Sequence, residues 1–274
     1  MKLRVALYCL LGGLPLTIPA LGAGHFIWWW LSGILFAASF VPVALFGPRK
    51  AAGQFGAIIP VFLIVTALCT WSEALIFVPG YGQRATGDLS GSALMYVITA
   101  VVLALLASLL KLSKPGEPAL PHRSSVSAVF LILLSSFAYV VYYLIFGSIT
   151  YQFFTKGYYP EATQAVARLG LWFWGIQLAR GVLMTLAVVP IIYTLRMKRW
   201  HAAIAIGSII WICGGAAPLL LPNAFMGTTQ RLIHTVEIFT QNFSLGVTAV
   251  LLFRPKSLPH AANPAANPAA STAN

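Results

Sequence analysis

The chain is poor in charge, and acidic residues are especially scarce. Only 8% of its 274 residues are charged, and five of them are aspartate or glutamate. A soluble domain carries about a quarter charged residues, so this chain cannot cover a water-facing surface in the usual way. The scarcity of charge excludes an ordinary soluble domain.

Cysteine is also rare, and the common catalytic motifs are missing. Cys9, Cys69 and Cys213 form no CxxC and no paired metal spacing, so we expect small buried hydrophobic side chains at these positions. The sequence has no glycine-rich phosphate loop, no GxSxG elbow and no HExxH. We therefore predict no metal site and assign neither a cofactor nor a catalytic residue.

What the chain has in abundance is apolar sequence. Hydrophobic residues make up 59% of it, and its mean hydropathy is +0.86. Apolar runs at 57–77, 93–110, 129–146 and 171–195 approach or exceed the roughly 20 residues that cross a bilayer. They lack the one-sided apolar stripe of a surface helix. The pattern predicts an all-α integral membrane protein, a polytopic helical bundle.

Eight membrane spans account for the apolar runs. We predict them at 5–22, 26–47, 55–79, 92–110, 127–149, 170–195, 202–222 and 231–253. They would form one transmembrane domain over 1–253, with possible four-span halves at 1–110 and 127–253 joined by an inner loop at 111–126. The tail at 254–274, rich in proline and small residues, is expected to be disordered and cytoplasmic.

The N-terminus has two interpretations. MKLR followed by an apolar run and Ala20-Leu21-Gly22 resembles a cleavable signal peptide, and cleavage would leave seven spans. The alternative is a retained first helix bent at Pro15 and Pro19. We favour retention because an uncleaved first helix commonly serves as the insertion signal.

The lysines and arginines predict the orientation. Cytoplasmic loops of membrane proteins are enriched in both residue types. With the N-terminus inside, the outer segments contain only Arg84, Lys156, Arg168 and Arg231. The inner segments contain Lys2, Arg4, Arg49, Lys50, Lys111, Lys114, Arg123, Arg196, Lys198, Arg199, Arg254 and Lys256. We predict cytoplasmic N- and C-termini in a multi-pass protein of a cell membrane, such as a bacterial inner membrane.

The partners follow from the same distribution of charge. The net charge of +12 is dispersed over several inner segments and forms no basic stripe interleaved with aromatics, so we predict no nucleic-acid partner. Its expected partners are the lipid bilayer and anionic lipid headgroups on the cytoplasmic side. A membrane-protein partner or a homo-oligomer remains an open alternative.

A few charged or titratable residues lie inside the predicted spans, where their burial costs free energy, and they indicate the functional site. A charge at the bilayer centre costs about 2.5–3.5 kcal/mol, so one that is kept there marks a functional site by default. Glu73, Arg180, His234 and Glu237 lie in three different spans, all in the outer half of the membrane. The sequence therefore predicts one polar cluster at that height.

Helical spacing extends the cluster. Gln230, His234, Glu237 and Gln241 recur at i, i+4, i+7 and i+11, which places them on one helix face. Gln177 precedes Arg180 by about one turn, and the fifth span contributes tyrosines. The predicted ligand-binding or proton-handling residues are Glu73, Gln177, Arg180, His234, Glu237, Gln241, Tyr139 and Tyr143.

An arginine stays charged within the membrane, so Arg180 requires a partner. We predict an ion pair with Glu237, and we keep Glu73 as the rival partner. Either pair could be structural rather than functional. A metal held by His234, Glu237 and Glu73 is the less favoured alternative, since a lone His-x-x-Glu is a weak signal.

Three functions fit these residues. The favoured one is binding or transport of a small polar or lipidic solute, because prolines at Pro15, Pro19, Pro42, Pro60, Pro190 and Pro218 allow bends and local unwinding. The second is an integral-membrane enzyme that uses His234 and Glu237 as acid and base and Arg180 to hold an anionic group. The third is a structural or assembly subunit, packed through small residues such as Ala203 and Gly207.

Overall fold

The chain folds into a bundle of helices. A computed structural model describes residues 1–21, 25–77, 81–83, 85–117, 120, 123–157, 162–222 and 226–254, and within them no strand occurs. Eight stretches of the described residues are long and apolar enough to cross a membrane. The predicted all-α polytopic fold is confirmed.

The eight spans are numbered here in chain order. They are span 1, α1 (Lys2–Gly12) and η1 (Leu14–Ala20); span 2, α2 (Phe26–Ser39) and α3 (Val41–Phe46); span 3, α4 (Ala51–Pro60), η2 (Val61–Cys69) and α5 (Thr70–Phe77); span 4, α6 (Ala85–Leu109); span 5, α7 (Ser125–Thr150) and η4 (Tyr151–Thr155); span 6, α9 (Leu171–Thr194); span 7, α10 (Arg199–Trp211), η5 (Ile212–Ala216) and α11 (Ala217–Leu220); and span 8, α12 (Thr228–Ile238), η6 (Phe239–Phe243) and α13 (Ser244–Phe253). Two short elements, η3 (Tyr81–Gln83) and α8 (Ala162–Leu169), lie between spans. The predicted boundaries agree to within a few residues, except that α6 begins well before the predicted 92 and span 5 continues through η4 to Thr155, beyond the predicted 149.

The prolines interrupt several of these spans. Proline cannot donate the helical hydrogen bond and clashes with the preceding turn. Span 2 breaks at Phe40, just before Pro42, and Pro60 is the last residue of α4 before η2 begins. Pro190, by contrast, lies within the continuous helix α9. The predicted bends therefore occur at some prolines and not at others.

The outward face of the bundle is apolar. Leu171 is 88% exposed, Val126 82% and Trp172 79%. Monomeric soluble proteins rarely expose contiguous apolar surface on this scale. A surface of this kind is suited to lipid, in agreement with the multi-pass architecture.

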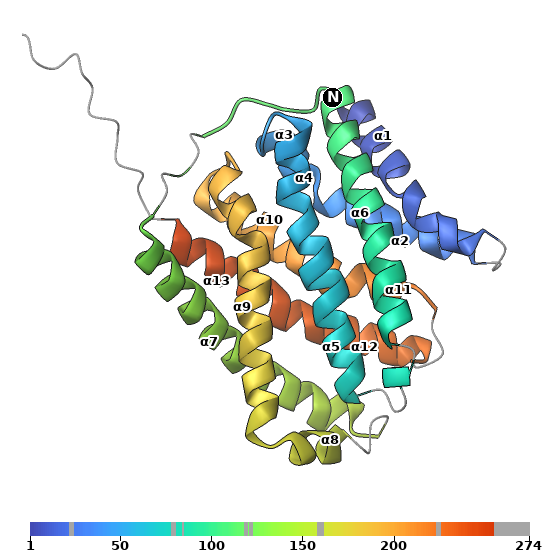
Figure 1. Cartoon of the computed structure of the whole chain (residues 1–274), viewed down its shortest axis with the longest axis vertical. Helices are drawn as coiled ribbons and strands as arrows, with labels where there is room; N and C mark the ends of the chain where they lie inside the picture. The colour runs from blue at the N-terminus through green and yellow to red at the C-terminus, as the bar shows by residue number, and fades with distance from the viewer. Residues whose placement is uncertain are drawn as a thin grey trace, which may run out of the picture.

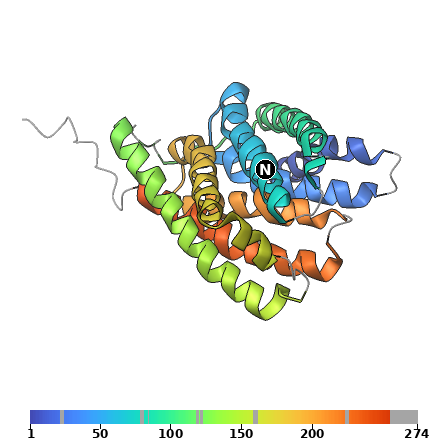
Figure 2. The same cartoon turned by 60° about the horizontal axis from the view of Figure 1, so that its bottom comes forward.

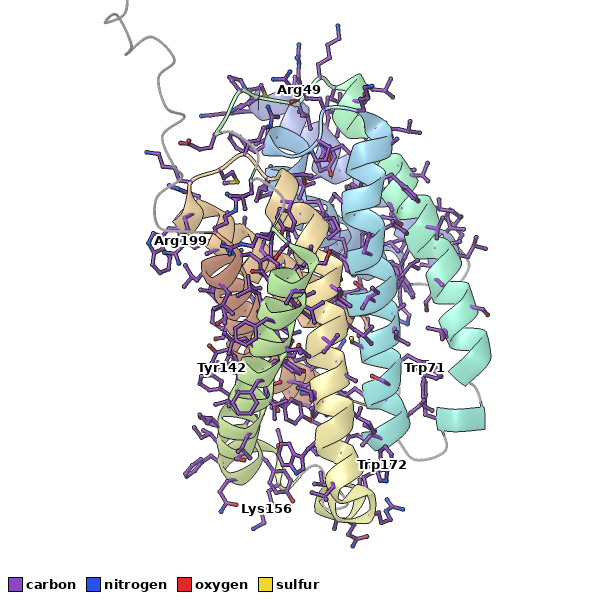
Figure 3. The ribbon with its side chains drawn as sticks, turned by 60° about the vertical axis from the view of Figure 1, so that its left-hand side comes forward. Arg49, Trp71, Tyr142, Lys156, Trp172 and Arg199 are labelled. Atoms are coloured by element: carbon purple, nitrogen blue, oxygen red, sulfur yellow. The ribbon has the colours of Figure 1, made fainter. Side chains whose placement is uncertain are left out.

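The two ends of the bundle differ in their charged residues. The basic end contains the start of α1, the turn at 47–50, the turn at 195–198 and the end of α13, and the far end contains η4, α8 and the start of α12 (Figure 1). Arg49 and Arg199 lie at the basic end, and Lys156 and Trp172 lie at the far end (Figure 3). The N-terminus and Arg254 are on the same side, as an even number of spans requires. Residues 255–274, where a disordered tail is predicted, lie outside the described residues.

Arginines hold the helix ends at the basic end. The last carbonyls of a helix lack intrahelical donors and form the negative end of its dipole, so a cation there is stabilising. Each of the helices that end at the basic end, α3, α6, α9 and α13, has an arginine on its terminal carbonyls. The contacts are Arg196 Nε to Phe46 O at 3.3 Å, Arg4 Nη1 to Leu110 O at 3.5 Å, Arg254 Nη2 to Ile192 O at 2.8 Å, Arg123 Nη2 to Phe253 O at 3.1 Å and Arg199 Nη2 to Leu251 O at 2.7 Å.

Arg254 is the most enclosed of these arginines. It is 5% exposed, and it also donates to Met197 O at 2.7 Å and to Leu195 O. Burial lowers the pKa of its guanidinium to about 10. Because this pKa still lies far above 7, the side chain stays charged at neutral pH and keeps its electrostatic interaction with the end of α9.

The orientation of the bundle can be tested by thiol labelling. In a background with Cys9, Cys69 and Cys213 replaced, Lys156→Cys should react with a membrane-impermeant maleimide added outside cells. Arg49→Cys should react only after the membrane is opened, because lysine and arginine accumulate on the cytoplasmic side. Both side chains are exposed and lie at opposite ends (Figure 3). The reverse pattern of labelling would invert the predicted topology.

Candidate functional site

Arg180 is the buried charge at the centre of the site. Its side chain, from α9, is 8% exposed, and its Nη2 lies 2.9 Å from Glu73 Oε2 of α5. Its Nη1 donates to Gln177 Oε1, one turn earlier on α9, at 2.9 Å. The predicted preference for Glu237 as the partner of Arg180 is wrong, and the rival partner Glu73 forms the pair.

Glu237 is occupied within its own span. Its Oε2 lies 2.9 Å from His234 Nδ1, and its Oε1 accepts a hydrogen bond from Gln241 Nε2 at 3.3 Å. These contacts follow the helix spacing that places His234, Glu237 and Gln241 on one face. Both carboxylate oxygens have partners on span 8, which explains why Glu237 does not pair with Arg180.

The two pairs form a single electrostatic unit. His234 interacts electrostatically with Glu73 and Arg180 as well as with its own partner Glu237. Arg180 with Glu73 is neutral, and His234 with Glu237 is neutral when the imidazole carries its second proton. A proton gained or lost by the imidazole of His234 therefore changes the net charge of the whole cluster by one unit.

Two tyrosines of α7 close one side of the cluster. The rings of Tyr139 and Tyr143 lie 6.1 Å apart, and Tyr143 packs edge-on against Phe173 of α9 at 5.9 Å. Both tyrosines interact electrostatically with Glu73, Arg180 and Glu237. The structure therefore places them beside both pairs. The hydroxyl of their neighbour Tyr142 lies 2.8 Å from Thr248 Oγ1, so this side chain faces α13 instead (Figure 3).

Two donors in the cluster have no partner among the residues that the structure describes. Gln177 is fully buried, and because its Oε1 accepts from Arg180, its Nε2 points elsewhere and meets no acceptor. Arg180 Nε is likewise buried without a partner. A buried donor left unsatisfied costs about 1–3 kcal/mol. Gln177 Nε2 and Arg180 Nε are thus two buried donors of the cluster whose hydrogen bonds the described residues do not supply.

Three side chains of the cluster are partly exposed at the surface of the bundle. The side chains of Glu73 and His234 are each 19% exposed, and that of Glu237 is 15% exposed. Glu73 lies near the far end of span 3, and His234 lies near the far end of span 8. The site is therefore a polar patch in the far half of the bundle, closed toward the basic end by the apolar core.

Sequence reasoning missed two residues of the cluster. Cys69, 3% exposed at the end of η2, lies close enough to Arg180 to interact with its guanidinium. Gly147 of α7 lies beside Gln241 and Glu237, so that a methyl group there would lie 3.4 Å from Gln241 Nε2 and 3.6 Å from Glu237 Oε1. Each lies one turn from a predicted residue, Cys69 before Glu73 and Gly147 after Tyr143, and this spacing is the signal that could have found them.

π-Helical segments adjoin the cluster. Such segments are rare and occur mostly as single turns, often at functional sites. The nine-residue η2 ends at Cys69, one turn before Glu73, and η6 contains the buried Gln241 and Asn242. The wider π turns alter which side chains face the bundle interior at the height of the cluster. Apolar composition alone does not predict them.

A metal site is not evident in this part of the molecule. Among the described residues, no three histidine, cysteine, aspartate or glutamate side chains lie together in a way that could hold a metal ion. His234 and Glu237 contact each other, while Glu73 contacts Arg180. The arrangement thus supplies acid–base groups and hydrogen-bond donors.

Comparison with known proteins adds no family. No protein-family model, no curated protein and no solved structure matches the chain.

Proposed function

We propose that the protein binds a small polar solute, or the polar head of a lipidic one, at the cluster around Arg180 and carries it across the membrane. The observation that supports this most directly is the pair of unpartnered donors, Gln177 Nε2 and Arg180 Nε. A solute oxygen, from a carbonyl, hydroxyl, carboxylate or phosphate group, would satisfy them.

The internal charge balance narrows the kind of solute. Glu73 already neutralises Arg180, so the site does not need an anion to be stable in the membrane. A neutral solute could bind with the His234–Glu237 pair in its neutral form. An anionic solute would be favoured when the imidazole of His234 carries its second proton, which would couple binding to protons.

The breaks in the spans suit a carrier. Spans 2, 3, 7 and 8 are interrupted by a proline break or a π segment, and these interruptions allow helices to bend within the membrane. In carriers, substrate sites characteristically lie near such discontinuous helices.

The proposal predicts a ligand that depends on Gln177. Mass spectrometry of the purified protein should detect an oxygen-bearing small molecule or lipid that is retained by the parent protein. We expect Gln177→Leu to lower its occupancy at least about tenfold, since each lost hydrogen bond in a buried site costs on the order of 1.4 kcal/mol or more. Gln152→Leu, on the exposed part of η4, is the matched control and should retain the ligand.

Equal retention of every co-purifying molecule by both glutamine variants would refute this site. Thermal unfolding of the same samples would show that Gln177→Leu is folded, so that a lost ligand reports on the site itself.

An enzyme is the second candidate, and one contact favours it. The 2.9 Å contact between His234 Nδ1 and Glu237 Oε2 is the arrangement in which a carboxylate orients an imidazole for proton transfer. Incubation of the protein with the molecule found by mass spectrometry separates the two functions. An enzyme converts it to a new mass, whereas a carrier returns it unchanged.

A further inference from the structure

The first four spans pack against one another in the same way as the last four. Span 1 packs on spans 2 and 4, and span 5 packs on spans 6 and 8. Span 3 packs on span 4 and crosses to span 6, and span 7 packs on span 8 and crosses to span 2. α1 and α2 consequently lie at one edge of the bundle and α7 at the opposite edge (Figure 2).

Individual helix crossings match between the halves. Gly33 of span 2 crosses span 1 at Gly13, where a methyl group on Gly33 would lie 2.3 Å from Gly13 O. Gly181 of span 6 crosses span 5 at Ser136, where a methyl group would lie 3.0 Å from Ser136 Cα. In both halves, a glycine of the second span therefore makes the close crossing with the first.

The spacing along the chain matches as well. The separation along the chain between Gly33 and Gly181 equals the separation between Pro42 and Pro190. Lys50 and Lys198, the N-caps of spans 3 and 7, are separated by that number too. Equal spacing over three features indicates two copies of one four-span unit, and an even number of spans gives both copies the same direction in the membrane.

The two halves meet in the middle of the membrane through their π segments. η2 of span 3 packs against η5 of span 7. A methyl group placed on Gly214 of η5 would lie 3.1 Å from Val65 Cγ1 of η2. Spans 3 and 7 correspond to each other in the two halves, so the pseudo-two-fold axis passes between them.

Hydrogen bonds join the halves at the basic end. The Arg196 amide donates to Phe46 O at 2.8 Å, and its guanidinium donates to Phe46 O and to Gly47 O at 3.2 Å. The same residue accepts from the Glu117 amide at 3.1 Å and donates to Ser113 Oγ at 3.2 Å. Arg196 thus connects the turn before span 7 to the turn before span 3 and to the loop between the halves.

A cavity of about 100 Å³ lies among residues of spans 3 and 4 of the first half, and Pro218 is the residue of the second half that lines it. Thr66, 3% exposed, lines this cavity, and its hydroxyl interacts with the Cys213 thiol of η5 in the second half. At the basic end the halves are joined by the backbone and side-chain hydrogen bonds of Arg196, whereas in the far half the ion pair of Glu73 with Arg180 crosses between them.

We infer that the halves, residues 1–110 and 127–253, move relative to each other as two units, opening at the far end about a hinge at Arg196. The inference rests on the proposed function and deepens it, because opening at the far end would expose the cluster to that side of the membrane, one of the two openings that alternating access in a carrier requires. The cluster around Arg180 combines Glu73 of the first half with Arg180 of the second, so the movement would act on the site directly.

Distance measurements between spin labels test the movement without any solute. The labels replace lipid-exposed residues in a background lacking the native cysteines, in protein reconstituted into lipid nanodiscs. Labels at Leu94 and Trp172 measure the distance between the two halves at the far end. Labels at Leu109 and Val126 measure it at the basic end. Phe153 with Trp172 is the control within the second half.

The far-end pair across the halves should give two populations of distance, separated on the order of 5 Å, the scale of established helix shifts. The other two pairs should each give one narrow population. Arg196→Ala should broaden the distribution of the Leu109–Val126 pair, because it removes the side-chain ties at the hinge.

A far-end distribution as narrow as the control pair would overturn the inference, as would equal broadening of all three pairs. Neither result depends on a bound ligand. Failure of the rocking inference is thus distinguishable from failure of the proposed function, which the co-purified molecule decides.

Discussion

Glu73→Gln is expected to destabilise the protein by about 3–5 kcal/mol, because it leaves the buried guanidinium of Arg180 without its counter-charge. The two side chains are 19% and 8% exposed and lie 2.9 Å apart, so water compensates little for the loss. Arg180→Met should cost a similar amount by stranding the carboxylate. The double variant Glu73→Gln with Arg180→Met should recover much of the loss, since it removes both charges together. Thermal unfolding in detergent would measure the coupling.

The matched control for this cycle is Glu237→Gln combined with Arg180→Met. Glu237 contacts His234 and Gln241 rather than Arg180, so its effect should add to that of Arg180→Met with little coupling. Stronger coupling of Arg180 to Glu237 than to Glu73 would contradict the observed pairing.

Gly33→Ala and Gly246→Ala should destabilise the bundle by about 1–3 kcal/mol or more, although alanine is the better helix former. The added methyl group would lie 2.3 Å from Gly13 O in the first case and 2.6 Å from Gly207 Cα in the second. Both obstacles are backbone atoms, which cannot rotate away. Relief requires that whole helices separate. The fraction of folded protein extracted from membranes, together with its midpoint of thermal unfolding, would measure the loss.

Gly175→Ala in α9 provides the control, because a methyl group at this position meets nothing within 4 Å. It should raise stability by about 0.5–1 kcal/mol through helix propensity alone. If all three substitutions behaved alike, the close crossings of spans 1 with 2 and 7 with 8 would not exist as described.

The sequence predicted the spans well because bilayer thickness fixes the length of an apolar run. It also predicted the height of Glu73, Arg180, His234 and Glu237, because depth follows from counting residues along each helix. Which spans lie beside one another in the membrane plane was harder to predict. Glu73 and Glu237 lie at similar depth, and only the packing of span 3 against span 6 brings Glu73 to Arg180.

The prediction of Arg180 with Glu237 failed for a further local reason. His234 lies one turn before Glu237 and Gln241 one turn after it, so this carboxylate already had partners on its own helix face. The spacing that identified the polar face therefore also indicated that Glu237 was occupied. The π segments were not predictable, since η2 is composed of the same apolar residues as an ordinary membrane helix.

The arginines on the helix ends bear on attempts to re-engineer this protein. In membrane proteins the count of basic residues on each side directs insertion, so inverting a topology usually begins by neutralising those residues. Here Arg4, Arg123, Arg196, Arg199 and Arg254 also bind terminal carbonyls. Lysine would preserve the insertion signal but cannot reproduce the guanidinium fork that spans two carbonyls. Biogenesis and folding stability are thus encoded by the same side chains, and a variant made to reverse the first would erode the second.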